Sequence, residues 1–147
     1  MTKTKTNISA PWHMWVLGIV LLLWNGLAAF DYIMTVIRYE PYLAGHPKEV
    51  LSYFYNAPIW MYVTWGISMI GGFIGTVLLL MRQRLAVPVY TIAWLFSVLA
   101  VAYSIVNPVP GGGNALFGVA VIIISLLILV YFYWLQDEAC CGSLITC

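Results

Sequence analysis

Four long apolar stretches alternate with short polar connections along this chain. The apolar stretches cover residues 12–37, 58–81, 85–106 and 115–135. Each is long enough for a helix to cross a hydrocarbon core, which takes about 20 residues. None shows the alternation of a membrane barrel strand. Because a helix satisfies its own backbone hydrogen bonds, which lipid cannot do, the pattern predicts an all-α bundle of four transmembrane helices.

The connections between these stretches differ in length. Residues 82–84 are so few that the helices on either side must be antiparallel neighbours. Residues 107–114 contain prolines and consecutive glycines and predict an uncharged turn. Residues 38–57 form the long connection, in which residues 47–54 predict a short amphipathic helix that lies on the outer membrane surface or caps the bundle.

Composition supports a single membrane domain that covers residues 1–147, with residues 136–147 as a cytoplasmic tail. Of the 147 residues, 63% are hydrophobic and 7% are charged, whereas an ordinary soluble domain has about 25% charged residues. Such a chain cannot cover a water-soluble globule with polar surface, so we expect the lipid bilayer to surround it. The net charge of +1 excludes the basic field that nucleic-acid binding requires.

Basic residues indicate an orientation. The predicted topology places one group of them on the side of the termini and a smaller group on the other, namely Lys3, Lys5, Arg82 and Arg84 against Arg38 and Lys48. Lysine and arginine prefer the cytoplasmic side of short loops, so we expect both termini in the cytoplasm. The first apolar stretch also fits a signal peptide, but we expect it to be retained as an anchor.

Asp31 is the charged residue inside the first predicted helix, near its outer end. On a helix it shares a face with Trp24, Thr35 and Arg38. Asp31 is then either a proton-linked or substrate-binding carboxylate at the base of an outward pocket, or a structural contact to loop tyrosines, Arg38 or Lys48.

Asn25 is a deeper polar residue of the same helix and lies about 120° around it from Asp31. An amide inside a bundle commonly bonds across helices. We favour that interpretation over direct contact with a ligand, which stays open.

The second predicted helix carries Gly71, Gly72 and Gly75. The spacing Gly71-x-x-x-Gly75 lets two helix backbones approach closely. It therefore predicts a packing face, filled either by the first helix or by another subunit.

Residues of the types that bind metals are poorly arranged for a site. His13 and His46 fall on opposite membrane faces of the predicted topology, and Cys140, Cys141 and Cys147 lie in the tail. Three sulfurs without a nearby histidine do not make a standard zinc set. No catalytic or phosphate-binding motif is present, so we expect no metal, no cofactor and no catalytic residues.

The segment 22–88 combines aromatic, glycine and charged residues in a recognisable order: Leu23-Trp24-Asn25-Gly26, Asp31-Tyr32, Arg38, Tyr42, Tyr53-Phe54-Tyr55, Pro58, Trp60, Trp65, Gly71-Gly72, Gly75, Leu78-Leu79-Leu80 and Arg82 through Pro88. This order resembles a group of small bacterial four-helix inner-membrane proteins, some of which carry the label "sugar transporter". The architecture is also similar, more loosely, to DoxX-like proteins. The resemblance implies a location and supplies no catalytic residues.

Three functions follow as hypotheses, in decreasing order of preference. The first is a non-enzymatic accessory or structural subunit of a larger membrane complex, because the chain is small and carries a glycine face. The second is a homo-oligomeric transporter or channel-like carrier that uses Asp31, with Asn25 and Trp24 along its path and Arg38 at its mouth. The third is a quinone- or lipid-linked membrane enzyme. The first two require a protein partner or self-association.

Overall fold

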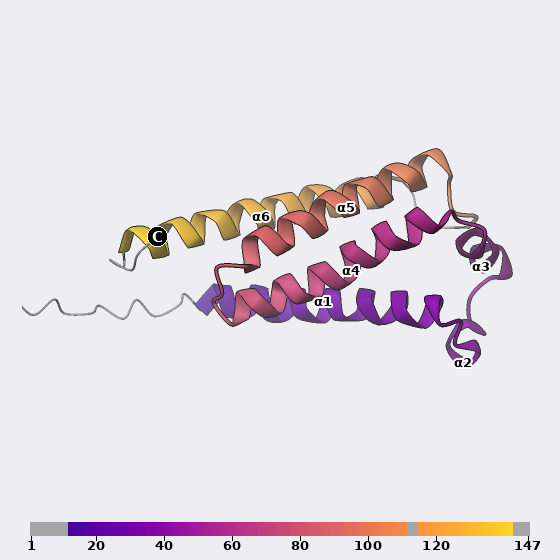
Figure 1. The fold of residues 1–147 in the computed structure, drawn as a ribbon, viewed down its shortest axis with the longest axis horizontal. Coiled ribbons are helices and arrows are strands. Elements are labelled where there is room, and N and C mark those ends of the chain that lie inside the picture. The colour runs from indigo at the N-terminus through magenta and orange to yellow at the C-terminus, as the bar shows by residue number, and fades with distance from the viewer. Residues whose placement is uncertain (1–11, 112–114, 143–147) are drawn as a thin grey trace, which may run out of the picture.

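Four long helices form the body of the molecule. The computed structural model describes residues 12–111 and 115–142, and within these residues every element is a helix. The long helices are α1 (Trp12–Val36), α4 (Ile59–Leu80), α5 (Ala86–Val106) and α6 (Ala115–Gly142). All four are long and apolar enough to cross a membrane, which confirms the predicted number. They lie side by side in an elongated bundle (Figure 1).

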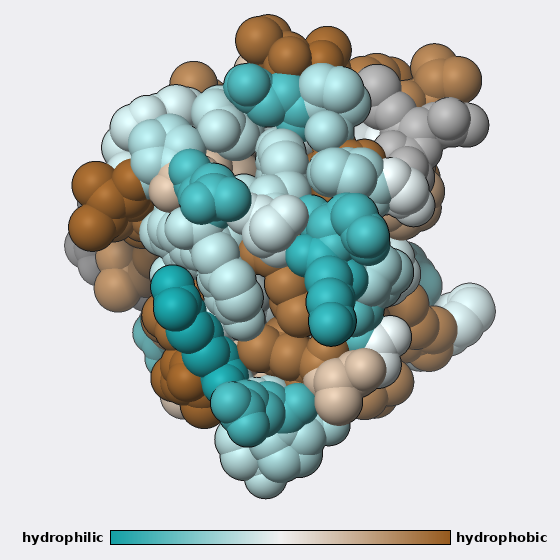
Figure 2. Space-filling model, turned by 90° about the vertical axis from the view of Figure 1, so that its right-hand side faces the viewer, coloured by the Kyte–Doolittle hydropathy of each residue, from teal (hydrophilic) through white to brown (hydrophobic). Residues whose placement is uncertain are grey.

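Two short helices lie at one end of the bundle, which we call the α3 end. They are α2 (Glu40–Leu43) and α3 (Lys48–Tyr55). The amphipathic helix predicted over 47–54 corresponds to α3, whereas α2 was not expected. Pro41 in the first turn of α2 explains it, since the fixed φ of proline suits that position. Figure 2 looks onto this end, where hydrophilic residues cover much of the face and hydrophobic ones show between them and at the edges.

The opposite end, which we call the terminal end, holds the start of α1, the turn from α4 to α5 and the finish of α6 (Figure 1). α6 was expected to stop at residue 135 but continues to Gly142. Residues 136–139 are mostly good helix formers, so the helix runs past its apolar part. The side chains of Cys140 and Cys141, and all of Cys147, lie outside the part of the chain that the structure describes.

α1 stops at Val36 because Arg38 adopts a left-handed conformation, with φ of 55°. The N–H of Arg38 donates to the carbonyl of Thr35 at 3.2 Å, and the next N–H donates to that of Met34 at 3.1 Å. This is a Schellman-type helix end. The expectation that Arg38 continues the helical face of Asp31 is therefore wrong, because the chain has already turned away.

The helices pack in the order in which they follow one another. α1 packs on α4, α4 on α5, and α5 on α6. One buried cluster takes side chains from all four of them: Leu21 from α1, Leu79 from α4, Val87 and Tyr90 from α5, and Phe132 from α6. α4 is the most buried of the four, so its side chains decide how the bundle is held together.

Candidate functional site

Asp31 contacts the loop between α1 and α4. The hydroxyl of Tyr42, on α2, donates a hydrogen bond to Oδ1 of Asp31 at 2.9 Å. The ring of Tyr42 also lies edge-on to Phe30, with centroids 5.5 Å apart. Bonding to the carboxylate, with a smaller part from desolvation, raises the pKa of Tyr42. Contact with a loop tyrosine is what the structural interpretation of Asp31 predicts.

Arg38 contacts a different part of the same loop. Its guanidinium lies 4.3 Å from the ring centroid of Tyr55, on α3, in a cation–π arrangement. Thr35 is buried. Asp31 and Arg38 thus attach α2 and α3, respectively, to the end of α1. Trp24, the remaining candidate on this helix, is 56% exposed.

Asn25 joins α1 to α4. Its Nδ2 donates to the carbonyl of Leu21 at 2.9 Å and to Oγ1 of Thr76 at 3.3 Å. Thr76 is fully buried and donates in turn to the carbonyl of Gly72 at 2.8 Å. A Cβ added to Gly72 would lie 2.7 Å from Oδ1 of Asn25, so the glycine leaves the space that the amide occupies.

The amide belongs to a cluster that draws on all four long helices, and we call it the four-helix polar cluster: Asn25, Thr76, Tyr90 and Ser125. Tyr90, on α5, is a near neighbour of both Asn25 and Ser125, on α6. None of these four side chains is charged at neutral pH. They suit interhelical hydrogen bonding better than proton transfer.

The glycine face of α4 is filled from within the chain. A Cβ at Gly71 would lie 3.0 Å from Cβ of Ala93, and one at Gly75 would lie 3.2 Å from Cβ of Tyr90. Ala93 and Tyr90 belong to α5, so neither of the two occupants expected from the sequence fills this spacing. Of the three glycines singled out, only Gly72 faces α1.

Aromatic contacts at the α3 end were not predicted from the sequence. Tyr32 donates to the carbonyl of Tyr62 at 3.2 Å and meets Trp65 edge-on, with ring centroids 5.0 Å apart. Phe54 stacks on the same indole at 4.9 Å. The Tyr32 hydroxyl occupies the place that a Cβ at Gly66 would take. An aromatic residue and a glycine on separate helices give no local signal that they meet.

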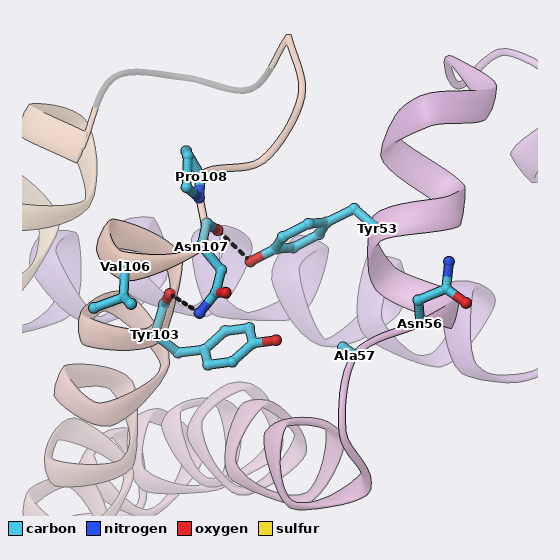
Figure 3. A pocket seen from close by; sticks show the side chains of 7 residues that line it. All are labelled: Tyr53, Asn56, Ala57, Tyr103, Val106, Asn107 and Pro108. Atoms are coloured by element: carbon cyan, nitrogen blue, oxygen red, sulfur yellow. Dashed lines mark hydrogen bonds between the residues drawn. The ribbon is translucent and has the colours of Figure 1, made fainter.

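An open pocket lies between α3 and the end of α5, and we call it the vestibule (Figure 3). Its volume is about 380 Å³, and its lining is Tyr53, Asn56, Ala57, Tyr103, Val106, Asn107 and Pro108. The Tyr53 hydroxyl donates to the carbonyl of Asn107 at 2.8 Å. Burial, and to a smaller extent the neighbouring Tyr103, raise the pKa of Tyr53. The lining carries no charge and includes none of the candidate site residues predicted from the sequence.

Comparison of the chain with known protein families, with curated proteins and with solved structures finds no match in any of the three. The two histidines lie near opposite ends of the bundle, His13 at the start of α1 and His46 between α2 and α3. Among the described residues, no three histidine, cysteine, aspartate or glutamate side chains are grouped to hold a metal ion.

Proposed function

We propose that this chain is a non-enzymatic accessory subunit of a larger membrane complex. We place it in a bacterial inner membrane with both termini in the cytoplasm. The distribution of lysine and arginine supports that orientation, because Arg82 and Arg84 lie in the turn at the terminal end.

The exposed indole of Trp24 carries this proposal. Trp24 lies halfway along the 25 residues of α1 and is therefore near the middle of the bilayer in this orientation. Its N–H makes no hydrogen bond within the described part of the chain, whereas the N–H of Trp94 donates to the carbonyl of Ile122 at 3.1 Å. Tryptophan favours membrane interfaces, where its N–H finds acceptors, and lipid chains provide none. An acceptor on a partner helix would satisfy it.

The surroundings of Trp24 support the same role. Val20, Leu23 and Leu27 are exposed beside it and share its face at helical spacing. Together they form an apolar strip along α1, on the side turned away from this chain's own core. A second transmembrane helix would pack on such a strip with the indole at its centre.

Transport through Asp31 ranks second. A proton-linked or substrate-binding carboxylate has to exchange partners during its cycle, and Asp31 already accepts a hydrogen bond that ties α2 to α1. Asn25 is similarly engaged with Thr76. A quinone- or lipid-linked enzyme ranks third.

The test is to isolate the tagged full chain from its native membrane in mild detergent and to determine the mass and composition of what is extracted. We expect a second membrane protein, which Trp24→Leu releases while the bundle stays folded. Trp134→Leu is the matched control, because Trp134 is similarly exposed but lies at the end of the apolar span of α6. Extraction of single copies of the chain would contradict the proposal.

Extraction of a homo-oligomer would instead favour the transport hypothesis. Uptake by Asp31→Asn would then be compared with uptake by the unaltered protein. Loss of uptake with the oligomer intact would assign Asp31 to the transport path.

A further inference from the structure

A groove lies between α4 and α5 in the half of the bundle nearest the α3 end, and we call it the α4–α5 groove. Its volume is about 200 Å³, and no residue of its lining is charged. α4 lines it with Trp65 and Ser68, α5 with Ser97, and α3 with Tyr53 and Phe54. Because α3 lies beside the start of α4 and the finish of α5 (Figure 1), its two aromatic residues form the part of the wall at the α3 end.

The groove contains hydroxyl groups without a partner. Ser68 is only 7% exposed, and its hydroxyl makes no hydrogen bond within the described residues. Helix serines and threonines commonly bond to a carbonyl of the preceding turn, as Thr91 and Ser125 do in this chain at 2.8 and 2.7 Å. Ser97 likewise makes no such bond in the part of the chain that the structure describes. Ser68 lies nine residues after Ile59, the first residue of α4, which is about 14 Å along the helix. Both hydroxyls are therefore free to bind a small polar molecule that reaches this depth.

α3 is attached to the bundle by side chains rather than by its backbone. Within the described residues, no hydrogen bond between backbone groups joins α3 to another helix. The Tyr53 hydroxyl donates to the carbonyl of Asn107 at 2.8 Å, as Figure 3 shows. The Tyr62 hydroxyl, on α4, donates to the carbonyl of Phe54. Phe54 also stacks on the indole of Trp65, with ring centroids 4.9 Å apart. Two hydrogen bonds and this stacking thus hold α3 against the groove.

The segments on either side of α3 leave it room to move. A Cβ added to Gly45, before α3, would meet no atom within 4 Å, and Asn56 and Pro58, after it, are exposed. No residue of α3 itself is buried, and its contact with α1 is the cation–π arrangement of Arg38 and Tyr55. An element with few buried contacts opens at a lower free energy than the core beside it. We therefore expect α3 to separate from the bundle while the four long helices stay packed.

We propose that α3 is a hinged cap on the α4–α5 groove, which lifts to admit small uncharged polar solutes from the α3 end to Ser68 and Ser97. With α3 in place, Tyr53 and Phe54 complete the wall of the groove and limit access to the two hydroxyls. When α3 lifts, these two side chains leave the wall and the groove opens on that side. Uncharged solutes are favoured, because the lining supplies no charge to pair with an ion. The cap is separate from the partner surface around Trp24 on α1.

The rate at which Ser68→Cys reacts with N-ethylmaleimide tests the cap. The purified full chain is studied in detergent micelles, with its three native cysteines replaced by serine, and intact-protein mass spectrometry follows the modified fraction. Tyr53→Phe and Tyr62→Phe each keep an aromatic ring and remove one hydrogen bond that holds α3. Each should raise the rate about fivefold, because the loss of one neutral hydrogen bond raises the population of the open state by about that factor. The two changes together should raise it about 25-fold, since the bonds are formed by different groups.

Tyr39→Phe is the matched control, because Tyr39 lies in the same connection and its hydroxyl makes no hydrogen bond within the described residues. It should leave the rate unchanged. Thr76→Cys places a second reporter at a fully buried position deeper in the bundle and should stay unreactive in every variant. An unchanged rate at Ser68→Cys in the double variant would overturn the proposal. So would reaction of Thr76→Cys in parallel with Ser68→Cys, because the whole bundle would then be opening. Thermal unfolding identifies any variant that has not folded, and Tyr62→Phe decides the question if Tyr53→Phe is unstable.

Discussion

At the scale of single residues, Asn25 shows how an amide is accommodated inside an apolar bundle. It bonds within its own helix and across to Thr76, and Gly72 leaves the space for its oxygen. Interhelical hydrogen bonds of this kind contribute about 0.6 kcal/mol on average and up to about 1.7 kcal/mol. The amide thus stabilises one particular arrangement of α1 on α4.

Asn25→Ala should lower the free energy of unfolding by about 1 kcal/mol, because the bond to Thr76 is lost. Denaturant unfolding in mixed micelles measures the change. The double variant Asn25→Ala with Thr76→Val should lose less than the sum of the single changes. Thr91→Val, which removes a bond within one helix, should combine additively with Asn25→Ala. If the effects of Asn25→Ala and Thr76→Val on the free energy of unfolding were strictly additive, the hydrogen bond between the two residues would contribute nothing.

The bond between Tyr42 and Asp31 predicts a pH effect. It raises the pKa of Tyr42 above the ordinary value of 10.0, so the folded state favours the neutral phenol. The stability that this bond contributes is complete below pH 10 and is lost as the pH rises through the higher, folded-state pKa.

Asp31→Asn should therefore lower the pKa of Tyr42, as measured by NMR titration of isotope-labelled tyrosine, with Tyr42→Phe assigning the signal. Tyr53 is the internal control, because burial and Tyr103 raise its pKa. Its titration should not change. A Tyr42 pKa that is unaffected by Asp31→Asn would remove the structural role assigned to Asp31.

At the scale of elements, α4 is the helix against which both α1 and α5 pack. One side of it receives α1 at Gly66 and Gly72, and another receives α5 at Gly71 and Gly75. A glycine in a helix interior costs about 1 kcal/mol relative to alanine. That cost is offset by the close approach of two antiparallel neighbours, α1 and α5, the second of which is joined to α4 by a tight turn.

Gly71→Ala should destabilise the fold by about 1 kcal/mol or more, because the new methyl would lie 3.0 Å from Cβ of Ala93. Adding Ala93→Gly should restore the space and part of the stability. Gly26→Ala is the matched control, since its methyl would meet Phe73 at an ordinary 3.6 Å and should be neutral or stabilising. Unfolding in micelles and particle mass are measured together. A change in oligomeric mass without a change in unfolding would indicate that Gly71 faces another subunit.

At the scale of the whole molecule, four helices that are long and apolar enough to cross a membrane separate the α3 end from the terminal end. Gly45, between α2 and α3, and Gln83, between α4 and α5, mark these two ends and are both exposed. The orientation that we propose puts Gly45 outside and Gln83 in the cytoplasm.

Cysteine labelling in intact cells tests this orientation. Cys140, Cys141 and Cys147 are replaced by serine, and Gly45→Cys or Gln83→Cys is introduced. A membrane-impermeant maleimide should label the first variant directly and the second only after permeabilisation. The reverse result would invert the proposed orientation, and labelling of both in intact cells would contradict a membrane-spanning bundle.

The sequence by itself determined the number of long helices and most of their ends. A hydrophobic run of sufficient length has one stable backbone conformation in lipid, and that requirement is local. α3 was predictable for a similar reason, since a proline and an amphipathic repeat lie within a few residues of each other. The resemblance to small four-helix membrane proteins stays a prediction.

Only the tertiary structure decided which groups meet. Gly71 and Gly75 signal a close approach, but their spacing does not specify that α5 fills it. Asp31 could have bonded to several loop residues, and the left-handed turn at Arg38 and the unexpected α2 determine that Tyr42 reaches it. The pocket lined by Ser68 of α4 and by Ser97 and Ala100 of α5 depends on the register of these two helices, because small side chains from both lie at the same level. These features join residues far apart in the chain, so their energies depend on how the helices pack rather than on any local pattern.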